Sequence, residues 1–252
     1  MYSLLNFISM LYNLNMERKK KFKQKRKLWY RGLKTIMKIR YKQPKFVYLA
    51  DKPTKGSIIL SNHEGTDAPM SLEIYADFPV RMWGTSEMNS GLKNLYAYQT
   101  KVYYHEKKHW NLFGARIFCL LASPLTNLFY SGLNLISTYK DGRLKTTIKQ
   151  SIEAIKNGEN IVIFPEDSKD GYLPELKSFY LGFALLAEKC LKENIDVPIY
   201  VAYYKIKENI YVFGESILYS KLKEICANRE EIANYLLNKC NELGKIDISK
   251  HL

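Results

Sequence analysis

One of the four histidines, His63, lies in a setting suited to acid–base chemistry. It follows the apolar run of residues 56–61 and stands in the polar segment Asn-His-Glu-Gly-Thr. Imidazole titrates near neutral pH, so a loop histidine can take a proton from a hydroxyl group. Asp67, four residues further on, can hydrogen-bond the other ring nitrogen and stabilise the imidazolium. Asp67 is also a good helix N-cap because Pro69 follows it, and the two roles are compatible.

A second polar cluster follows another apolar run. Residues 161–164, Ile-Val-Ile-Phe, lead into Pro165-Glu166-Asp167-Ser168-Lys169. Both runs are typical of buried strands. Periodicity and turn residues predict further elements: helices over 142–157, 178–192 and 221–243, and strands over 197–203 and 210–213. This alternation predicts an α/β fold, a single domain with a mainly parallel central sheet flanked by helices. Active sites of such sheets lie beyond the carboxyl ends of the strands, where His63 and Glu166 both fall.

The two clusters resemble motifs of the glycerolipid acyltransferases, in particular the lysophosphatidate acyltransferases. Asn62-His63 followed by Asp67 resembles the family's Asn-His-x4-Asp motif, although only three residues separate His63 from Asp67 here. Phe164 to Lys169 resembles Phe-Pro-Glu-Gly-Thr-Arg, and residues 197–201 resemble the family's fourth, Val-Pro-containing strand. The shortened first motif leaves either Asp67 or Glu64 to orient the histidine. The second motif is matched loosely by residues 132–136, followed by Lys140 or Arg143.

The resemblance implies an enzyme of phospholipid biosynthesis. It would move a fatty acyl group from an acyl thioester, acyl-CoA or acyl-carrier protein, to a hydroxyl of a lysophospholipid or related phosphorylated alcohol. No other cofactor and no metal are expected. His63 and Asp67 are the expected catalytic residues, and Glu166 is expected to help bind the acceptor. The resemblance assigns the acceptor phosphate to basic side chains, namely Lys140, Arg143 and Lys169. Lysine keeps the charge of the family's arginine but loses its bidentate geometry.

A possible metal motif lies between the two clusters. Residues 105–109, His-Glu-Lys-Lys-His, match the zincin pattern His-Glu-x-x-His. Both intervening residues are lysines, and no acidic residue occurs from 107 to 140, so we interpret this segment as a solvated surface turn. The four cysteines are far apart and form no Cys-x-x-Cys pair, which predicts reduced thiols in a cytosolic compartment.

Basic charge is concentrated in an N-terminal arm, residues 1–45. From residue 17 to residue 45 there are fourteen Lys and Arg against one acid, which accounts for +13 of the formal net charge of +14. Apolar residues recur at helical spacing around positions 4–12 and 29–37. This pattern predicts amphipathic helices at an anionic membrane surface, with packing on the protein's own core as the alternative. Because the charge is confined to an arm flanked by apolar residues, lipid is favoured over nucleic acid.

A second membrane-related segment lies in the remaining chain, residues 46–252, which we expect to form the acyltransferase domain. Residues 117–139 carry no charged side chain, but Pro124 and several Ser, Thr and Asn residues interrupt them. We predict a monotopic, partly buried hairpin or the wall of an acyl pocket. No secretory signal is expected, because the basic run follows the apolar one. These features predict a peripheral or monotopic protein at the cytoplasmic face of the cell membrane. Alternatives are a non-catalytic membrane- or nucleic-acid-binding protein, or an esterase on the same fold.

Overall fold

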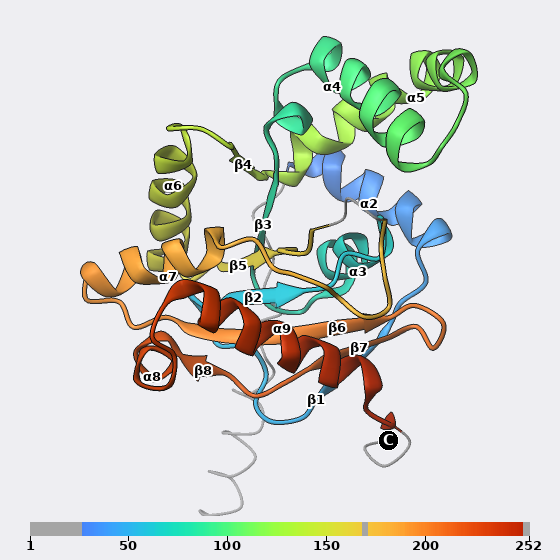
Figure 1. The fold of residues 1–252 in the computed structure, drawn as a ribbon. Helices are drawn as coiled ribbons and strands as arrows, with labels where there is room; N and C mark the ends of the chain where they lie inside the picture. The colour runs from blue at the N-terminus through green and yellow to red at the C-terminus, as the bar shows by residue number, and fades with distance from the viewer. Residues whose placement is uncertain (1–26, 168–170, 249–252) are drawn as a thin grey trace, which may run out of the picture.

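The computed structural model describes residues 27–167 and 171–248, which form an α/β domain around one eight-stranded sheet (Figure 1). The strand order is β1-β7-β6-β2-β5-β3-β4, with β8 paired to β6. All neighbouring pairs are parallel except β6 with β7 and β6 with β8, so the predicted fold class is confirmed. The strands are β1 Lys45–Tyr48, β2 Ile58–Ser61, β3 Val80–Thr85, β4 Ile136–Thr138, β5 Asn160–Ile163, β6 Pro198–Lys205, β7 Ile210–Phe213 and β8 Ile217–Leu218.

The central strands are the apolar runs that the sequence marks as buried. In β2, Ile58 pairs with Ile161 of β5 on one side and with Ile199 of β6 on the other. Strands covered on both faces read as continuous apolar runs, whereas a half-exposed strand alternates. Successive side chains of β2 therefore serve two cores: Ile58 and Leu60 face one cluster, and Ile59 faces the other.

Helices cover both faces of this sheet. They are α2 Leu28–Arg40, α3 Asp67–Tyr75, α4 Leu92–Tyr98, α5 Leu112–Leu133, α6 Leu144–Lys156, α7 Gly182–Lys192, α8 Tyr219–Ile225 and α9 Arg229–Lys245, with the 3₁₀ helix η1 Ser86–Asn89 and the π-helix η2 Gln99–Lys107. Helices α6 to α9 bury one core against the sheet, and α3 covers the opposite face. In Figure 1, α4 and α5 lie at the top of the view, beyond the sheet.

The predicted final helix is in fact two helices, α8 and α9. The break falls at residues 226–228, where Asn228 caps α9 by accepting a hydrogen bond from the backbone N–H of Glu231 at 2.9 Å. Leu222, Leu236 and Leu237 are buried, whereas Ile225 at the end of α8 is 60% exposed. The N-cap signal of Asn228 competes with the helical periodicity and divides it.

Helix α2 is the described part of the predicted basic arm, and it packs on the domain along one side. The ring of Tyr30 is fully buried in a cluster with Met70, Ile74, Phe129 and Leu133 of α3 and α5. For this part of the helix, packing on the protein's own core is what the structure shows. On its other side, Ile36 and Ile39 are 62% and 85% exposed. Residues 1–26 lie outside the described part of the chain, and the domain boundary at residue 45 stays a prediction.

The uncharged segment 117–139 is not a hairpin, and that prediction was wrong. Residues 112–133 form the single helix α5, with Pro124 inside it, and the chain then enters β4 through Asn134 in a left-handed conformation. Two of the polar residues that suggested a break bond within the helix: the hydroxyls of Thr126 and Ser131 donate to the carbonyls of Ala122 and Leu128 at 2.9 and 2.7 Å. Such side-chain bonds to the preceding turn leave the helix intact. The hydroxyl of Ser123 donates to Oε1 of Gln99 in η2 at 2.7 Å.

Candidate functional site

The carboxyl ends of two neighbouring strands bring His63 and Glu166 together. His63 follows β2, Glu166 follows β5, and these strands are adjacent and parallel. The backbone N–H of His63 donates a hydrogen bond to Oε1 of Glu166 at 3.2 Å. The structure therefore confirms that the two residues lie at the same edge of the sheet, the position where α/β sheets bind ligands.

The imidazole of His63 is held between two aromatic rings. Its centroid lies 4.9 Å from that of Phe164 and 5.1 Å from that of Tyr172, and the Tyr172 ring is stacked at 25°. The buried Nδ1 atom has no hydrogen-bond partner among residues 27–167 and 171–248. Burial lowers the pKa of His63 to about 4; the nearby charge of Lys107 acts in the same direction, whereas backbone groups of Gly65 and His63 oppose the fall. The ring is therefore neutral at physiological pH, which is the form that accepts a proton.

The carboxyl group of Glu166 is shielded from water at the same place. Glu166 is 8% exposed, and its backbone forms an antiparallel bridge with Phe179. Burial raises the pKa of its carboxyl to about 7; Glu64 adds to this rise, whereas the His63 N–H and Lys107 oppose it. A carboxyl group with such a pKa exists in both protonation states near neutral pH, which is a common property of functional sites.

Asp67 does not pair with His63. The loop between them takes left-handed conformations at Glu64 and Gly65, with φ of 42° and 65°. Helix α3 then begins at Asp67, and Oδ1 of Asp67 lies 3.8 Å from Nη1 of Arg40. The N-cap position belongs to Thr66, so the predicted capping role of Asp67 was wrong by one residue. The short loop turns the side chain of Asp67 towards Arg40 and not towards the imidazole. A catalytic role for Asp67 therefore stays a prediction.

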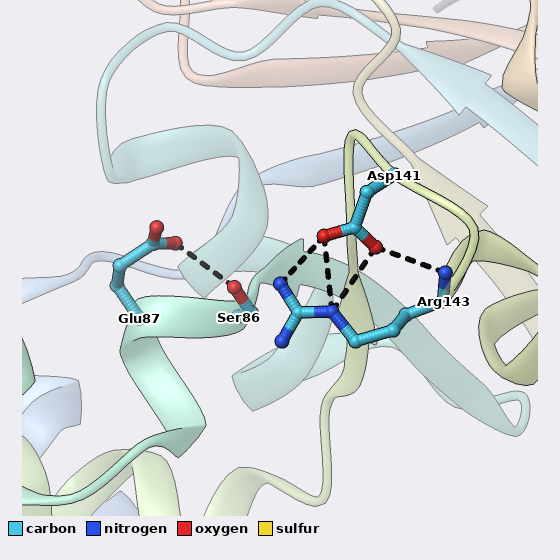
Figure 2. A network of polar contacts seen from close by, with 4 residues as sticks. All are labelled: Ser86, Glu87, Asp141 and Arg143. Carbon is cyan, nitrogen blue, oxygen red and sulfur yellow. Dashed lines mark hydrogen bonds and ion pairs between the residues drawn. The ribbon is translucent and has the colours of Figure 1, made fainter.

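Lys140 and Arg143 lie at the same edge of the sheet but further along it. Both follow β4, which is separated from β2 by β5 and β3, a distance of roughly 14 Å at the usual strand spacing. Arg143 binds back to Asp141 at 2.7–3.1 Å (Figure 2). Its guanidinium also lies over the ring of Tyr139. The structure thus does not bring these two cations next to His63. Lys169, the third expected phosphate ligand, lies outside the described residues.

A pocket of about 360 Å³ adjoins His63 and contains cations that the sequence analysis missed. Charged and small residues line it, namely Glu64, Asp67, Lys107, Lys108, Gly171, Tyr172 and Ile206. Lys107 and Lys108 belong to the zincin-like segment that we interpreted as a surface turn. The segment is largely exposed, with Lys108 in a turn, as expected of a surface turn, but Lys107 is half-buried at the end of the π-helix η2. π-Helical turns are frequent at functional sites. The pair of adjacent lysines between two histidines was the sequence feature that could have indicated a cationic site here.

The histidines of the same segment do not form a metal cluster. Nδ1 of His105 lies 2.8 Å from the carbonyl oxygen of Trp110, and His109 has a left-handed backbone with φ of 55°. Within residues 27–167 and 171–248, no group of three or more His, Cys, Asp or Glu side chains is placed to hold a metal ion.

A second pocket, of about 590 Å³, lies between α6 and α7. Its floor is apolar and includes Ile148, Ile152 and Leu185, and lysines line its rim. His63 and Glu166 line neither pocket, but the smaller one is lined by Glu64, the next residue after His63, and by Tyr172, whose ring stacks on the imidazole. The pKa values of Glu64 and Tyr172 are both raised by burial, so we place the candidate active site at the smaller pocket.

Comparison with known proteins adds no relative to this picture. No protein-family model matches the chain, and no curated protein matches it in sequence. The assignment of a function therefore depends on the geometry around His63 and on the resemblance of the four short motifs.

Proposed function

We propose that this protein is a membrane-associated O-acyltransferase that transfers a fatty acyl group from an acyl thioester to a hydroxyl of a lysophospholipid. The observation that carries the proposal is the pairing of His63 and Glu166 at the ends of adjacent parallel strands. The neutral imidazole of His63 can accept a proton, and the carboxyl of Glu166, which accepts a hydrogen bond from the His63 backbone N–H, lies at the same strand ends. The order and spacing of the motifs around these two residues support the same reaction class.

The reaction follows from the neutral imidazole. His63 takes the proton of the acceptor hydroxyl, and the oxygen attacks the thioester carbonyl. The new C–O bond forms, the C–S bond breaks, and the imidazolium returns the proton to the leaving thiolate. No acyl-enzyme is needed. The rings of Phe164 and Tyr172 cover part of the imidazole, which limits the water that competes with the acceptor at the base.

An apolar surface on α5 supports the membrane part of the proposal. Helix α5 is long and apolar enough to cross a bilayer, and only 22% of an apolar 18-residue stretch within it is buried. Most of its exposed residues are large and apolar, namely Phe113, Ile117, Phe118, Leu120, Leu121, Leu125 and Leu128. Arg116, near its N-terminal end, is the exposed charged residue of this helix. Exposed apolar patches of this kind mark interaction sites. A lysophospholipid acceptor stays partly in the bilayer, so an enzyme acting on it gains from such a surface.

The neighbouring helix α2 adds positive charge beside this apolar surface. Helix α2 packs on α5 through Tyr30 and exposes Arg31, Lys38 and Arg40. Basic residues near an anionic lipid surface contribute about 1 kcal/mol each at low salt. Apolar and basic groups side by side suit a helix pair that lies in the interface rather than one that crosses the bilayer. We therefore propose a monotopic placement at the cytoplasmic face of the cell membrane.

A transfer assay tests this function. Purified full-length protein is incubated with acyl-CoA or acyl-carrier protein and a panel of lysophospholipids in vesicles, and both the diacyl product and the released thiol are measured. We expect diacyl product, and we expect His63→Ala to lower its rate about 10²–10⁴-fold, the usual cost of losing a general base. The matched control is His109→Asn, because asparagine tolerates the left-handed backbone of that exposed residue.

Two outcomes would count against the proposal. Near wild-type turnover by His63→Ala, with the protein folded, would remove His63 as the base. Thiol release without diacyl product would indicate a thioesterase, which is the alternative of an esterase on the same fold.

A further inference from the structure

The pocket beside His63 contains charged groups of both signs. Glu64 and Asp67 come from the loop after β2 and the start of α3, whereas Lys107 and Lys108 come from the end of η2. The two pairs therefore reach one pocket of about 360 Å³ from different parts of the fold. This volume is within the range of small-molecule sites, about 300–1,000 Å³.

The acidic pair is held in a costly arrangement. Glu64 has a left-handed backbone, with φ of 42°, which non-glycine residues adopt rarely and usually at functional sites. Burial and the neighbouring Asp67 both raise the pKa of Glu64, which means that its negative charge is disfavoured there. A positively charged ligand group would relieve this penalty.

The basic pair lies close to the reacting groups. The charge of Lys107 lowers the pKa values of both His63 and Glu166, so its ammonium group lies near both. Lys108 is the next residue, and its Nζ lies 6.0 Å from the ring centroid of Tyr103. An anionic ligand group bound by these lysines would therefore sit beside the imidazole that we propose as the base.

We propose that this pocket binds a zwitterionic headgroup, with its phosphodiester at Lys107 and Lys108 and its ammonium at Glu64 and Asp67. This inference rests on the proposed function and names the acceptor class, a zwitterionic lysophospholipid such as lysophosphatidylethanolamine. A phosphate monoester would bring two negative charges beside Glu64 and Asp67. An anionic diester without an amine would supply no cation to Glu64, and Asp67 would keep only its 3.8 Å contact with Arg40.

Binding of soluble headgroups tests the pocket without turnover. Glycerophosphoethanolamine and glycerophosphoglycerol are similar in size and both are diesters, but only the first carries an ammonium group. Isothermal titration calorimetry on the full-length protein should give a dissociation constant about tenfold lower for glycerophosphoethanolamine, the effect expected of one partly buried charge-assisted contact. Equal or tighter binding of glycerophosphoglycerol, or binding of neither compound, would overturn the inference.

Single substitutions separate the two halves of the pocket. Glu64→Gln should bring the two dissociation constants together by weakening glycerophosphoethanolamine alone, whereas Lys108→Ala should weaken both compounds by a similar factor. Glu106→Gln and Lys101→Ala are matched controls, because both residues belong to η2, are exposed and do not line the pocket. If Glu64→Gln leaves the preference unchanged, the carboxylates do not recognise the ammonium group and the inference fails.

Turnover with intact lipids distinguishes this inference from the proposed function. With acyl-CoA as donor, lysophosphatidylethanolamine should be acylated with a higher kcat/KM than lysophosphatidylglycerol or lysophosphatidate. Preferred acylation of either anionic lipid would overturn the zwitterion inference while leaving the acyltransferase function intact. Selective binding of glycerophosphoethanolamine without acyl transfer to any lipid would overturn the proposed acyltransferase function and leave the zwitterion inference intact.

Discussion

Helices α6 and α5 are both rich in apolar residues, but α6 buries its apolar side chains whereas α5 exposes many of them. In α6, Ile148, Ile152 and Ile155 are 5–7% exposed and pack against the sheet. In α5, Leu121 and Leu125 are 78% and 61% exposed. Helix α6 alternates its isoleucines with lysines and other polar residues, whereas α5 is apolar on nearly every side.

This contrast shows that the pattern of apolar residues in a helix depends on everything that surrounds the helix, and not only on its contact with the protein core. One face of α6 meets the sheet and the other meets water, so its sequence is amphipathic. Helix α5 contacts the domain through a few residues such as Phe129 and Leu133, and the rest of its apolar surface exceeds what the domain covers. A helix that is apolar on all sides suits an apolar surrounding on the side away from the protein.

The first prediction, with the largest effect, compares a buried phenylalanine of α7, which packs on the same core as α6, with an exposed phenylalanine of α5. Phe183 of α7 is fully buried, so Phe183→Ala should lower the free energy of unfolding by about 3–5 kcal/mol. Phe113 of α5 is 74% exposed, so Phe113→Ala should change it by about 0.5 kcal/mol or less. Urea denaturation followed by circular dichroism measures both. An equal loss in the two variants would mean that the α5 surface is packed in solution and would break the comparison.

The second prediction concerns the buried carboxyl at the edge of the sheet. The pKa of Glu166 is raised from 4.5 to about 7, so the folded protein keeps a proton that the unfolded chain loses between these values. The free energy of unfolding therefore falls as pH rises through this window, by up to about 3 kcal/mol from this group. Glu166→Gln lacks the fall, so its stability relative to wild type should increase from pH 4.5 to pH 8 in urea titrations. A difference that does not change with pH would show that Glu166 ionises normally.

The third prediction tests the packing contact between α2 and α5. A Cβ atom on Gly132 would overlap the ring of Tyr30, so Gly132→Ala should cost about 1–3 kcal/mol by overpacking. Gly32, on the exposed side of α2, has no atom within 4 Å of the position of a Cβ. Gly32→Ala should therefore stabilise the protein by about 0.5–1 kcal/mol, as expected of alanine in a helix interior. Thermal unfolding of the pair separates packing from helix propensity, and similar behaviour of the two variants would mean that α2 is not docked on α5.

The smallest expected effect concerns the charge beside the apolar surface. Arg31→Ala on α2 should weaken binding to anionic vesicles by about 1 kcal/mol at low salt and by little at high salt. Lys145→Ala on α6 is the control, because it removes an exposed cation from the other layer. Vesicle sedimentation measures both variants. If Lys145→Ala weakens binding as much as Arg31→Ala does, the membrane-facing side is not the one formed by α2 and α5.

The short apolar runs were predictable because central strands need continuous apolar sequence. Residues 161–164 and 210–213 became β5 and β7 with shifts of one residue or none. Strands β1, β3, β4 and β8 were not predicted. Val80–Thr85 contains Arg81, whose guanidinium pairs with Glu159 at 3.3 Å, and such a partner, distant in sequence, cannot be read from periodicity.

The residue patterns were sufficient to predict that His63 and Glu166 follow buried parallel strands and lie at one edge of the sheet. Strand polarity is enough for this, because parallel strands end at the same edge. The neighbours of His63, in contrast, depend on how distant segments of the chain pack. A loop with two left-handed residues turned Asp67 to Arg40, and a π-helix distant in sequence brought Lys107 to the pocket. These contacts depend on backbone conformation and on packing between segments far apart in the chain, which local residue patterns do not encode.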